Sequence, residues 1–294
     1  GMGDTIIPPG ADPQQPTANT AVLADDARTI QQAAGSRYAP SSPLAALPAY
    51  LDEYRTIGTR FALVGKPCDI AAFRVMQAAD PTLTAAIPIT LSFFCAGVPS
   101  AQGAGKILDA LGIRSEALAS FRYRGNGWPG QAVATRHDGS EQSMSYHDSW
   151  GGILSKHVQH RCKICADGTG AAADIVCADA WQSDARGYPL FDEAPGVSLI
   201  VVRTGLGAQV IEAAQASAIL ETRPFEITEL ATIQPGQTGR KRALLARLAG
   251  LRLTGRPVPH YQGLHLFAAA RQNPPLRNLR NFLGMIRRVA LRNR

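Results

Sequence analysis

Two cysteines three positions apart constrain this chain more than any other feature. Cys162 and Cys165 are separated by two residues, a spacing that lets both thiolates bind one metal centre. Cys68, which follows Pro67, and Cys95, two residues before Gly97, lie upstream, so four sulfur ligands are available before Cys177 is considered. Five cysteines in 294 residues are too few, and odd in number, for a disulfide framework. Metal binding or redox chemistry is therefore expected.

Two successive strand-loop-helix units carry the upstream cysteines. An apolar run at residues 60–64 predicts a buried strand, and helical spacing follows over residues 69–79, with Cys68 in the turn between them. The pattern repeats with a strand at 87–94, Cys95 in the turn, and a helix at 102–111. Such units favour neighbouring parallel strands, whose carboxyl ends share one sheet edge. Both cysteines should lie there, close together, where helix N-termini favour thiolates.

The remaining pattern predicts an α/β fold with a mixed, partly parallel sheet flanked by helices and an inserted antiparallel hairpin region. The hairpin region lies between residues 120 and 149, and a helix at 150–159 leads to the paired cysteines. Further strands are expected at residues 173–178, 197–202 and 225–230, and a further helix at 209–220. The predicted domains are an irregular or extended lead-in over 1–20, an α/β domain over 21–236 that carries the cysteines, and a basic helical extension over 237–294.

Lys and Arg residues concentrate near the C-terminal end. The first 230 residues carry 17 Lys and Arg against 23 Asp and Glu, whereas the last 64 carry 13 Lys and Arg and no acid. A basic amphipathic helix is predicted at residues 238–251, and seven arginines follow between 271 and 294. Such a tail could bind anionic lipid, an acidic coenzyme tail or an acidic partner protein. A solvated surface, or a docking surface for an acidic redox partner protein or subunit, is favoured. Nucleic acid is disfavoured because interleaved aromatic residues and a nucleic-acid-binding motif are lacking.

The overall composition predicts a cytoplasmic protein. Hydrophobic residues make up 45% of the chain, enough for a large core. No uninterrupted apolar run approaches the roughly 18 residues of a membrane span, and no secretory signal is recognisable. A homo-oligomer is left open. No sequence motif of a hydrolase, metalloprotease or phosphate-binding loop is present, so catalytic residues stay unknown.

Spacing alone leaves the metal open between zinc and an iron-sulfur cluster. A zinc site could use two nitrogens and two sulfurs, from His157, His160, Cys162 and Cys165. A thioredoxin-type dithiol fits poorly, because the cysteine pair follows a predicted helix and precedes a glycine-rich turn. The equivalent positions of Cys68 and Cys95 favour a site made of four cysteines. Cys177 is then expected to be a core thiol.

Several motifs carry a resemblance to a known family. They are 35–38 (GSRY) with 40–41 (PS), 65–70 (GKPCDI), 93–100 (FFCAGVPS), 123–130 (YRGNGWPG), 150–151 (WG), 162–167 (CKICAD), 173–175 (ADI) and 179–181 (DAW). Through these motifs the chain resembles the coenzyme F-420 hydrogenase/dehydrogenase beta subunit family. The order of the motifs agrees with that family from about residue 20 to residue 205. That family includes subunits that pass electrons to a deazaflavin coenzyme, and plant and cyanobacterial relatives such as 7-hydroxymethyl chlorophyll a reductase.

The resemblance implies an iron-sulfur oxidoreductase or electron-transfer subunit with FAD. The implied ligands of one 4Fe-4S cluster are Cys68, Cys95, Cys162 and Cys165. The implied residues lining a flavin or coenzyme F-420 pocket are Ser36, Tyr38, Arg124, Gly125, Trp128 and Gly130. Turn geometry around a buried Trp is the alternative interpretation of this second set.

One departure from the family pattern bears on the flavin. Relatives usually have a long N-terminal region with a glycine-rich flavin-binding stretch, where this chain has a Pro-rich lead-in. Either a partner chain is expected to supply that half, or the protein is a shortened relative. Two other hypotheses stay open: a non-catalytic interaction domain with structural zinc or an empty cysteine site, and a shortened reductase that acts on a pigment or carbohydrate precursor.

Overall fold

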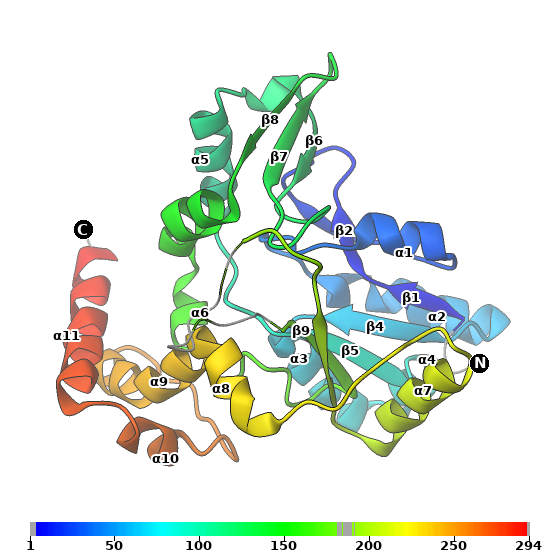
Figure 1. Cartoon of the computed structure of the whole chain (residues 1–294). Coiled ribbons are helices and arrows are strands. Elements are labelled where there is room, and N and C mark those ends of the chain that lie inside the picture. The colour runs from blue at the N-terminus through cyan, green and yellow to red at the C-terminus, as the bar shows by residue number, and fades with distance from the viewer. Residues whose placement is uncertain (1–3, 181–183, 185–189, 191, 293–294) are drawn as a thin grey trace.

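A five-stranded mixed sheet forms the centre of the molecule (Figure 1). The computed structural model describes residues 4–180, 184, 190 and 192–292. The strands, in spatial order, are β1 (Thr5–Ile7), β4 (Phe61–Gly65), β5 (Ile89–Phe93), β9 (Ile175–Asp179) and β10 (Ser198–Val202). The first four are parallel and β10 is antiparallel to β9. The predicted parallel pairing of the two strand-loop-helix units is thus confirmed.

Helices cover both faces of this sheet because its strands are apolar on both sides. On one face pack α2 (Leu47–Ile57), α3 (Pro67–Ala79) and α4 (Pro81–Ala86), which bury Ile70 and Phe73 against Phe61 and Leu63. On the other face α7 (Gly205–Ala216) packs Leu206 and Val210 against Ala62, Ile89 and Ile175. The short helices α1 (Ala27–Ala33) and η1 (Pro43–Ala46) precede α2.

A separate antiparallel sheet is inserted between β5 and β9. It consists of β6 (Leu118–Arg122), β7 (Ala132–Arg136) and β8 (Glu141–Met144), and α5 (Ala101–Leu111) packs Ile107 and Leu108 on it. The short 3-10 turn η2 (Ser115–Ala117) leads into β6. Together the two sheets confirm the predicted α/β class with an antiparallel insertion.

The lead-in, expected to be irregular or extended, contains extended strands: Thr5–Ile7 joins the main sheet beside β4, and Pro9–Ala11 (β2) pairs with Asn19–Ala21 (β3). Another local expectation was wrong. Residues 225–230 form no strand but the turn η5 (Ile227–Glu229) and the start of α8 (Leu230–Ile233). Ile227 is 76% exposed there, so no packed face stabilises a strand.

The helix expected at 150–159 was also wrong, in type and in bounds. A π-helix, η3 (His147–Ile153), continues into a 3-10 helix, η4 (Leu154–His157), and the short α6 (His160–Lys163) follows. The fully buried Leu154 anchors this segment against α5 and the inserted sheet. Tertiary packing therefore outweighs the regular α-helical spacing that the sequence suggested.

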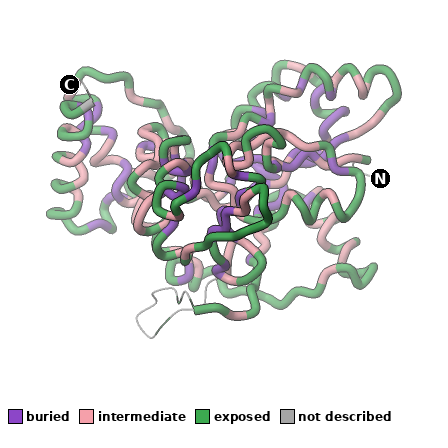
Figure 2. Tube along the Cα trace, turned by 90° about the horizontal axis from the view of Figure 1, so that it is seen from above, coloured by how far each residue is buried: buried purple, intermediate pink, exposed green. Residues whose placement is uncertain are grey.

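The C-terminal extension contains α9 (Pro235–Leu253), α10 (Leu266–Arg271) and α11 (Pro275–Arg292). Its core joins Leu244 and Leu248 of α9 to Met285 of α11, and Ile164 from the cysteine-pair loop lies in the same cluster. Figure 2 shows buried residues around the sheet and along the inner sides of these helices, with exposed outer turns. The proposed boundary at 236/237 remains a prediction. Within the described residues, no helix is long and apolar enough to cross a bilayer.

Candidate metal centre at the sheet edge

Cys95 lies at the carboxyl end of β5, where its loop is attached to the loop that follows the cysteine pair. The Phe94 amide donates to the Cys177 carbonyl at 2.9 Å, which extends the β5–β9 pairing by one residue. The Cys95 amide then donates to the Gly168 carbonyl, also at 2.9 Å. The two segments are therefore held side by side at this edge.

Gly97 brings the Cys95 loop directly onto Cys162. Its φ of +111° is in the region that favours glycine, and a Cβ there would lie 2.7 Å from Val158 Cγ1 and 3.2 Å from Cys162 Cβ. The next residue, Val98, donates its amide to Cys162 Sγ at 3.4 Å. Cys95 and Cys162 are thus brought together by backbone packing that leaves no room for a side chain at Gly97.

Cys68 reaches the same region from α3. The prediction placed it in a turn, but it is the second residue of the helix, because Pro67 can begin a helix at its first position. Arg161, the neighbour of Cys162, donates its Nη2 to Cys68 Sγ at 3.3 Å. The helix N-terminus and this guanidinium thus place positive charge beside Cys68 Sγ.

Burial raises the pKa of two of the four thiols. Burial raises the pKa of the Cys95 thiol to about 11, and the neighbouring Cys162 and Cys68 also raise it, while Arg240 lowers it. Burial likewise raises the pKa of Cys165, against a lowering effect of the Asp167 backbone and of Arg240. These two thiols carry protons at neutral pH, so metal binding there must release them. Cys68 and Cys162 raise the pKa of both Cys95 and Cys165, so the two buried thiols lie within electrostatic reach of the other two cysteines.

The described residues form no site for a single metal ion. Among the described residues, no group of three or more His, Cys, Asp or Glu is arranged to hold one metal ion. Zinc needs four ligands at roughly 2.0–2.3 Å from one point, whereas a four-iron cluster is itself several ångströms wide and its ligands stand farther apart. The predicted zinc set does not converge, and the His157 side chain packs on Gly103 of α5. Four thiols from three neighbouring segments match the four-cysteine donor set of such a cluster.

The fifth cysteine was predicted wrongly as a core thiol. Cys177 is exposed on β9, although its neighbours Ile175 and Val176 are buried. Cys177 lies on the same face of β9 as Ile175, because side chains alternate along a strand. Helix α7 packs on Ile175 but leaves Cys177, two residues nearer the end of β9, exposed. Its main-chain carbonyl, rather than its sulfur, contributes to the site by pairing with Phe94.

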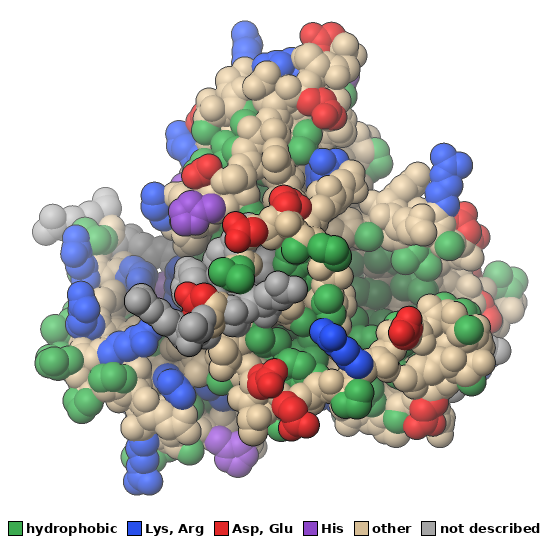
Figure 3. All heavy atoms as spheres, viewed as in Figure 1, with side chains coloured by type: hydrophobic (Ala, Val, Ile, Leu, Met, Phe, Trp, Pro, Cys, Tyr) green, Lys and Arg blue, Asp and Glu red, His purple; other side chains and the backbone are tan. Residues whose placement is uncertain are grey.

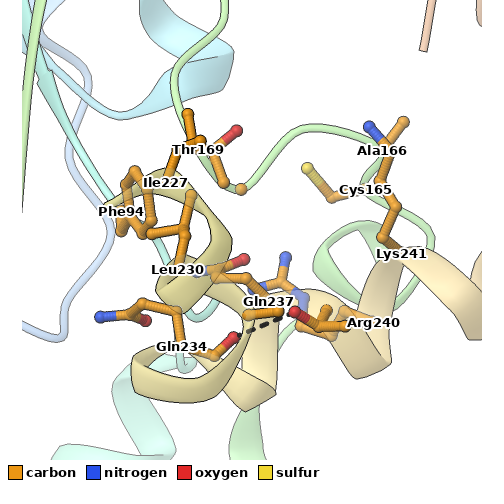
Figure 4. Close-up of a pocket in the computed structure, with 13 residues that line it drawn as sticks. Phe94, Cys165, Ala166, Thr169, Ile227, Leu230, Gln234, Gln237, Arg240 and Lys241 are labelled. Atoms are coloured by element: carbon orange, nitrogen blue, oxygen red, sulfur yellow. Dashed lines mark hydrogen bonds between the residues drawn. The ribbon is translucent and has the colours of Figure 1, made fainter. Parts of the chain in front are cut away.

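A cavity of about 300 Å³ adjoins the cysteine pair (Figure 4). One wall is formed by Phe94, Cys165 and Thr169 at the sheet edge, and the other by residues of α8 and α9 that include Arg240 and Lys241. Arg240 Nη1 donates to the Cys95 carbonyl at 2.6 Å, and Gln237 Nε2 donates to the same oxygen at 3.1 Å. Sequence reasoning missed Gln237 and Arg240, because charge counting cannot show which basic residue folds back onto the site.

The residues predicted to line a flavin pocket form a second cluster, centred on Arg124. Its side chain is 7% exposed, donates Nε to the Pro129 carbonyl at 2.6 Å and pairs Nη1 with Asp179 Oδ2 at 2.6 Å. The guanidinium also lies over the rings of Trp128 (5.5 Å) and Tyr146 (5.1 Å). Asp179 ends β9, so this cluster touches the same sheet edge as the cysteines.

Tyr38 and Ser36 border the Arg124 cluster. The Tyr38 ring lies 4.5 Å from the Trp150 ring. Burial raises the pKa of the Tyr38 hydroxyl, while the charge of Arg124 and a hydrogen bond with Ser36 lower it by a smaller amount. The preceding Gly35 has φ +95°, and a Cβ there would lie 3.0 Å from the Arg124 carbonyl. This close approach therefore depends on glycine, and the phenol stays neutral at ordinary pH.

The two glycines of the predicted set have a structural role. A Cβ at Gly130, where φ is +72°, would lie 2.7 Å from the Gly125 carbonyl oxygen, so only glycine fits this tight turn. The Glu193 carboxylate accepts from the amides of Trp128 (2.9 Å) and Gly130 (3.0 Å). The structure thus gathers the predicted residues, and their role in flavin binding remains a prediction.

The structure defines an α/β protein with four cysteines gathered near one edge of its main sheet, and comparison with known proteins identifies the family. Residues 58–228 match the family model that describes the C terminus of the coenzyme F420 hydrogenase/dehydrogenase beta subunit. Since this match spans more than half of the chain, the protein belongs to that family. Membership indicates a redox role like that of the beta subunits for which the family is named.

A solved structure supports the fold. A chain in the structure titled "Xenon derivatization of the F420-reducing [NiFe] hydrogenase complex from Methanosarcina barkeri" is similar with a TM-score of 0.55. The two chains are 20% identical, and the similarity covers 83% of this chain and 81% of that one. A search of curated proteins found no match.

Proposed function

We propose that this chain is an iron-sulfur oxidoreductase or electron-transfer subunit that moves electrons between a 4Fe-4S cluster and a flavin or deazaflavin carrier. The observation that carries the proposal is the attachment of three cysteine-bearing segments to one another at the sheet edge. Cys68, Cys95, Cys162 and Cys165 would hold the cluster. When bound, such a cluster exchanges single electrons, and a flavin or deazaflavin carries out the two-electron chemistry.

Other residues of the chain would position the cysteine sulfurs and adjust the reduction potential of the cluster. The Val98 amide and the Arg161 guanidinium donate to Cys162 Sγ and Cys68 Sγ. Hydrogen bonds to sulfur stabilise the more negative, reduced form and so raise the reduction potential. Burial of Cys95 and the helix α9 over its loop keep water from that side of the site.

Two places could receive the organic carrier, and they differ in charge. The cavity beside Cys165 presents Arg240 and Lys241, which suit an anionic group of a carrier. The Arg124 cluster is the family-based candidate for flavin, and there Asp179 already neutralises the guanidinium. An FAD site completed by a redox partner subunit agrees with both observations.

Elemental and flavin analysis of one anaerobic sample tests the proposal. We expect iron and sulfide in equal amounts, about four of each per chain, and broad absorption near about 400 nm. Cys162→Ser should abolish the colour, whereas the matched control Cys177→Ser, at an exposed position on β9, should retain it. A colourless protein with stoichiometric zinc would contradict the proposal and support a non-catalytic zinc domain.

A further inference from the structure

Helix α11 has an apolar face on each side. The inner face buries Met285 (0% exposed) and Val289 (7% exposed) in the core shared with α9. The outer face carries Leu276, Leu279 and Leu283, which are 76%, 52% and 53% exposed. Spacings of three and four residues place these leucines on one side of the helix. A helix that needed only to pack on α9 would not require them.

Arginines flank this outer row of leucines. Arg280 and Arg287 follow Leu276 and Leu283 by four residues each, so they lie next to the leucine row, and both are exposed. Among the described residues, neither has an ion pair. No acidic residue occurs anywhere after Glu229. Figures 1 and 3 show α11 as an outermost element, with basic and hydrophobic side chains along that edge.

We propose that the outer face of α11 (Leu276, Leu279, Arg280, Leu283 and Arg287) docks on the surface of a membrane that contains anionic lipids. Leucines enter the boundary between headgroups and acyl chains, and the flanking guanidiniums bind lipid phosphates. The helix lies parallel to the surface, which agrees with the lack of a spanning helix among the described residues. Attraction of several arginines to the negative surface adds to the burial of the leucines.

Charge favours a membrane over other occupants of this face. A second copy that presented the same face would bring arginine against arginine, which costs free energy. An acidic patch on a protein partner would complement the arginines but not the row of three exposed leucines. A diffuse negative surface with an apolar layer below it complements both properties.

Vesicle binding by the full-length chain tests the inference without any cofactor. We expect the protein to co-sediment with vesicles of phosphatidylcholine plus phosphatidylglycerol and to stay in solution with phosphatidylcholine alone. Arg280→Gln with Arg287→Gln should weaken binding about 30-fold, since each charge contributes about a factor of five. Leu279→Glu with Leu283→Glu should abolish it. The control Ile57→Glu changes another exposed apolar residue, 72% exposed at the end of α2, and should bind normally.

Several outcomes would overturn the inference. One is the lack of sedimentation with anionic vesicles by protein whose circular dichroism shows it to be folded. Another is unchanged binding by the Leu279→Glu, Leu283→Glu variant. If the unaltered chain is a dimer that this double variant dissociates, and neither binds vesicles, the outer face belongs to a second copy or protein contact instead.

Discussion

The two long helices of the C-terminal extension are both basic, yet they use their arginines differently. On α9, Arg240 donates to the Cys95 carbonyl and Arg247 Nη1 donates to the Lys163 carbonyl at 3.1 Å, so its cations fasten the cysteine loops. On α11, Arg280 and Arg287 are exposed and lie beside exposed leucines. Two helices with similar positive charge therefore have different roles: α9 supports the cysteine loops, and α11 presents its arginines to the outside of the molecule.

The largest expected difference concerns packing. Leu244 of α9 is 1% exposed and Leu279 of α11 is 52% exposed. We expect Leu244→Ala to lower the free energy of unfolding by about 3 kcal/mol, because it leaves a cavity in the core shared with Ile164. Leu279→Ala should change it by less than about 0.5 kcal/mol. Urea unfolding of both variants measures this, and equal losses would show that α11 is packed on both sides.

Two glycines give the next contrast. A Cβ at Gly250 of α9 would lie 2.6 Å from the Phe282 carbonyl oxygen of α11, whereas nothing lies within 4 Å of a Cβ at Gly284. Gly250→Ala should therefore force the helices apart at a cost of about 2 kcal/mol. Gly284→Ala should stabilise the chain by about 0.5 kcal/mol through helix propensity. Thermal unfolding distinguishes them, and a neutral Gly250→Ala would contradict the close helix contact.

The smallest effect concerns reduction potential. Arg240→Gln removes a positive charge and a 2.6 Å hydrogen bond next to Cys95. Since the reduced cluster is the more negative form, we expect its potential to fall by about 60 mV, the value of a tenfold change for one electron. Arg280→Gln, on the outer face of α11, should leave the potential unchanged. Anaerobic potentiometric titration measures both potentials. Equal shifts in the two variants would contradict the conclusion that α9 acts on the cysteine site through Arg240.

The sequence predicted the sheet edge well because strong local patterns encode it. The apolar runs around Leu63 and Leu91, each followed by a helix, were enough to predict neighbouring parallel strands with Cys68 and Cys95 at one edge. The spacing of Cys162 and Cys165 identified the third segment. These features depend on hydrophobic period and turn chemistry, which act over few residues.

Other features depend on contacts across the whole chain. The pairing of Thr5–Ile7 with Phe61–Gly65 joins segments more than fifty residues apart, and a three-residue strand gives too short a pattern to recognise. The contact of Arg240 with Cys95 spans 145 positions. The exposure of Cys177 depends on which helix covers that end of β9, which the local sequence does not reveal.

Electron paramagnetic resonance of the dithionite-reduced, anaerobically purified chain tests the central claim most directly. The account predicts one signal of a reduced 4Fe-4S cluster per chain, retained in Cys177→Ser and lost in Cys162→Ser. A folded protein that contains no iron signal, or whose signal survives Cys162→Ser, would contradict it.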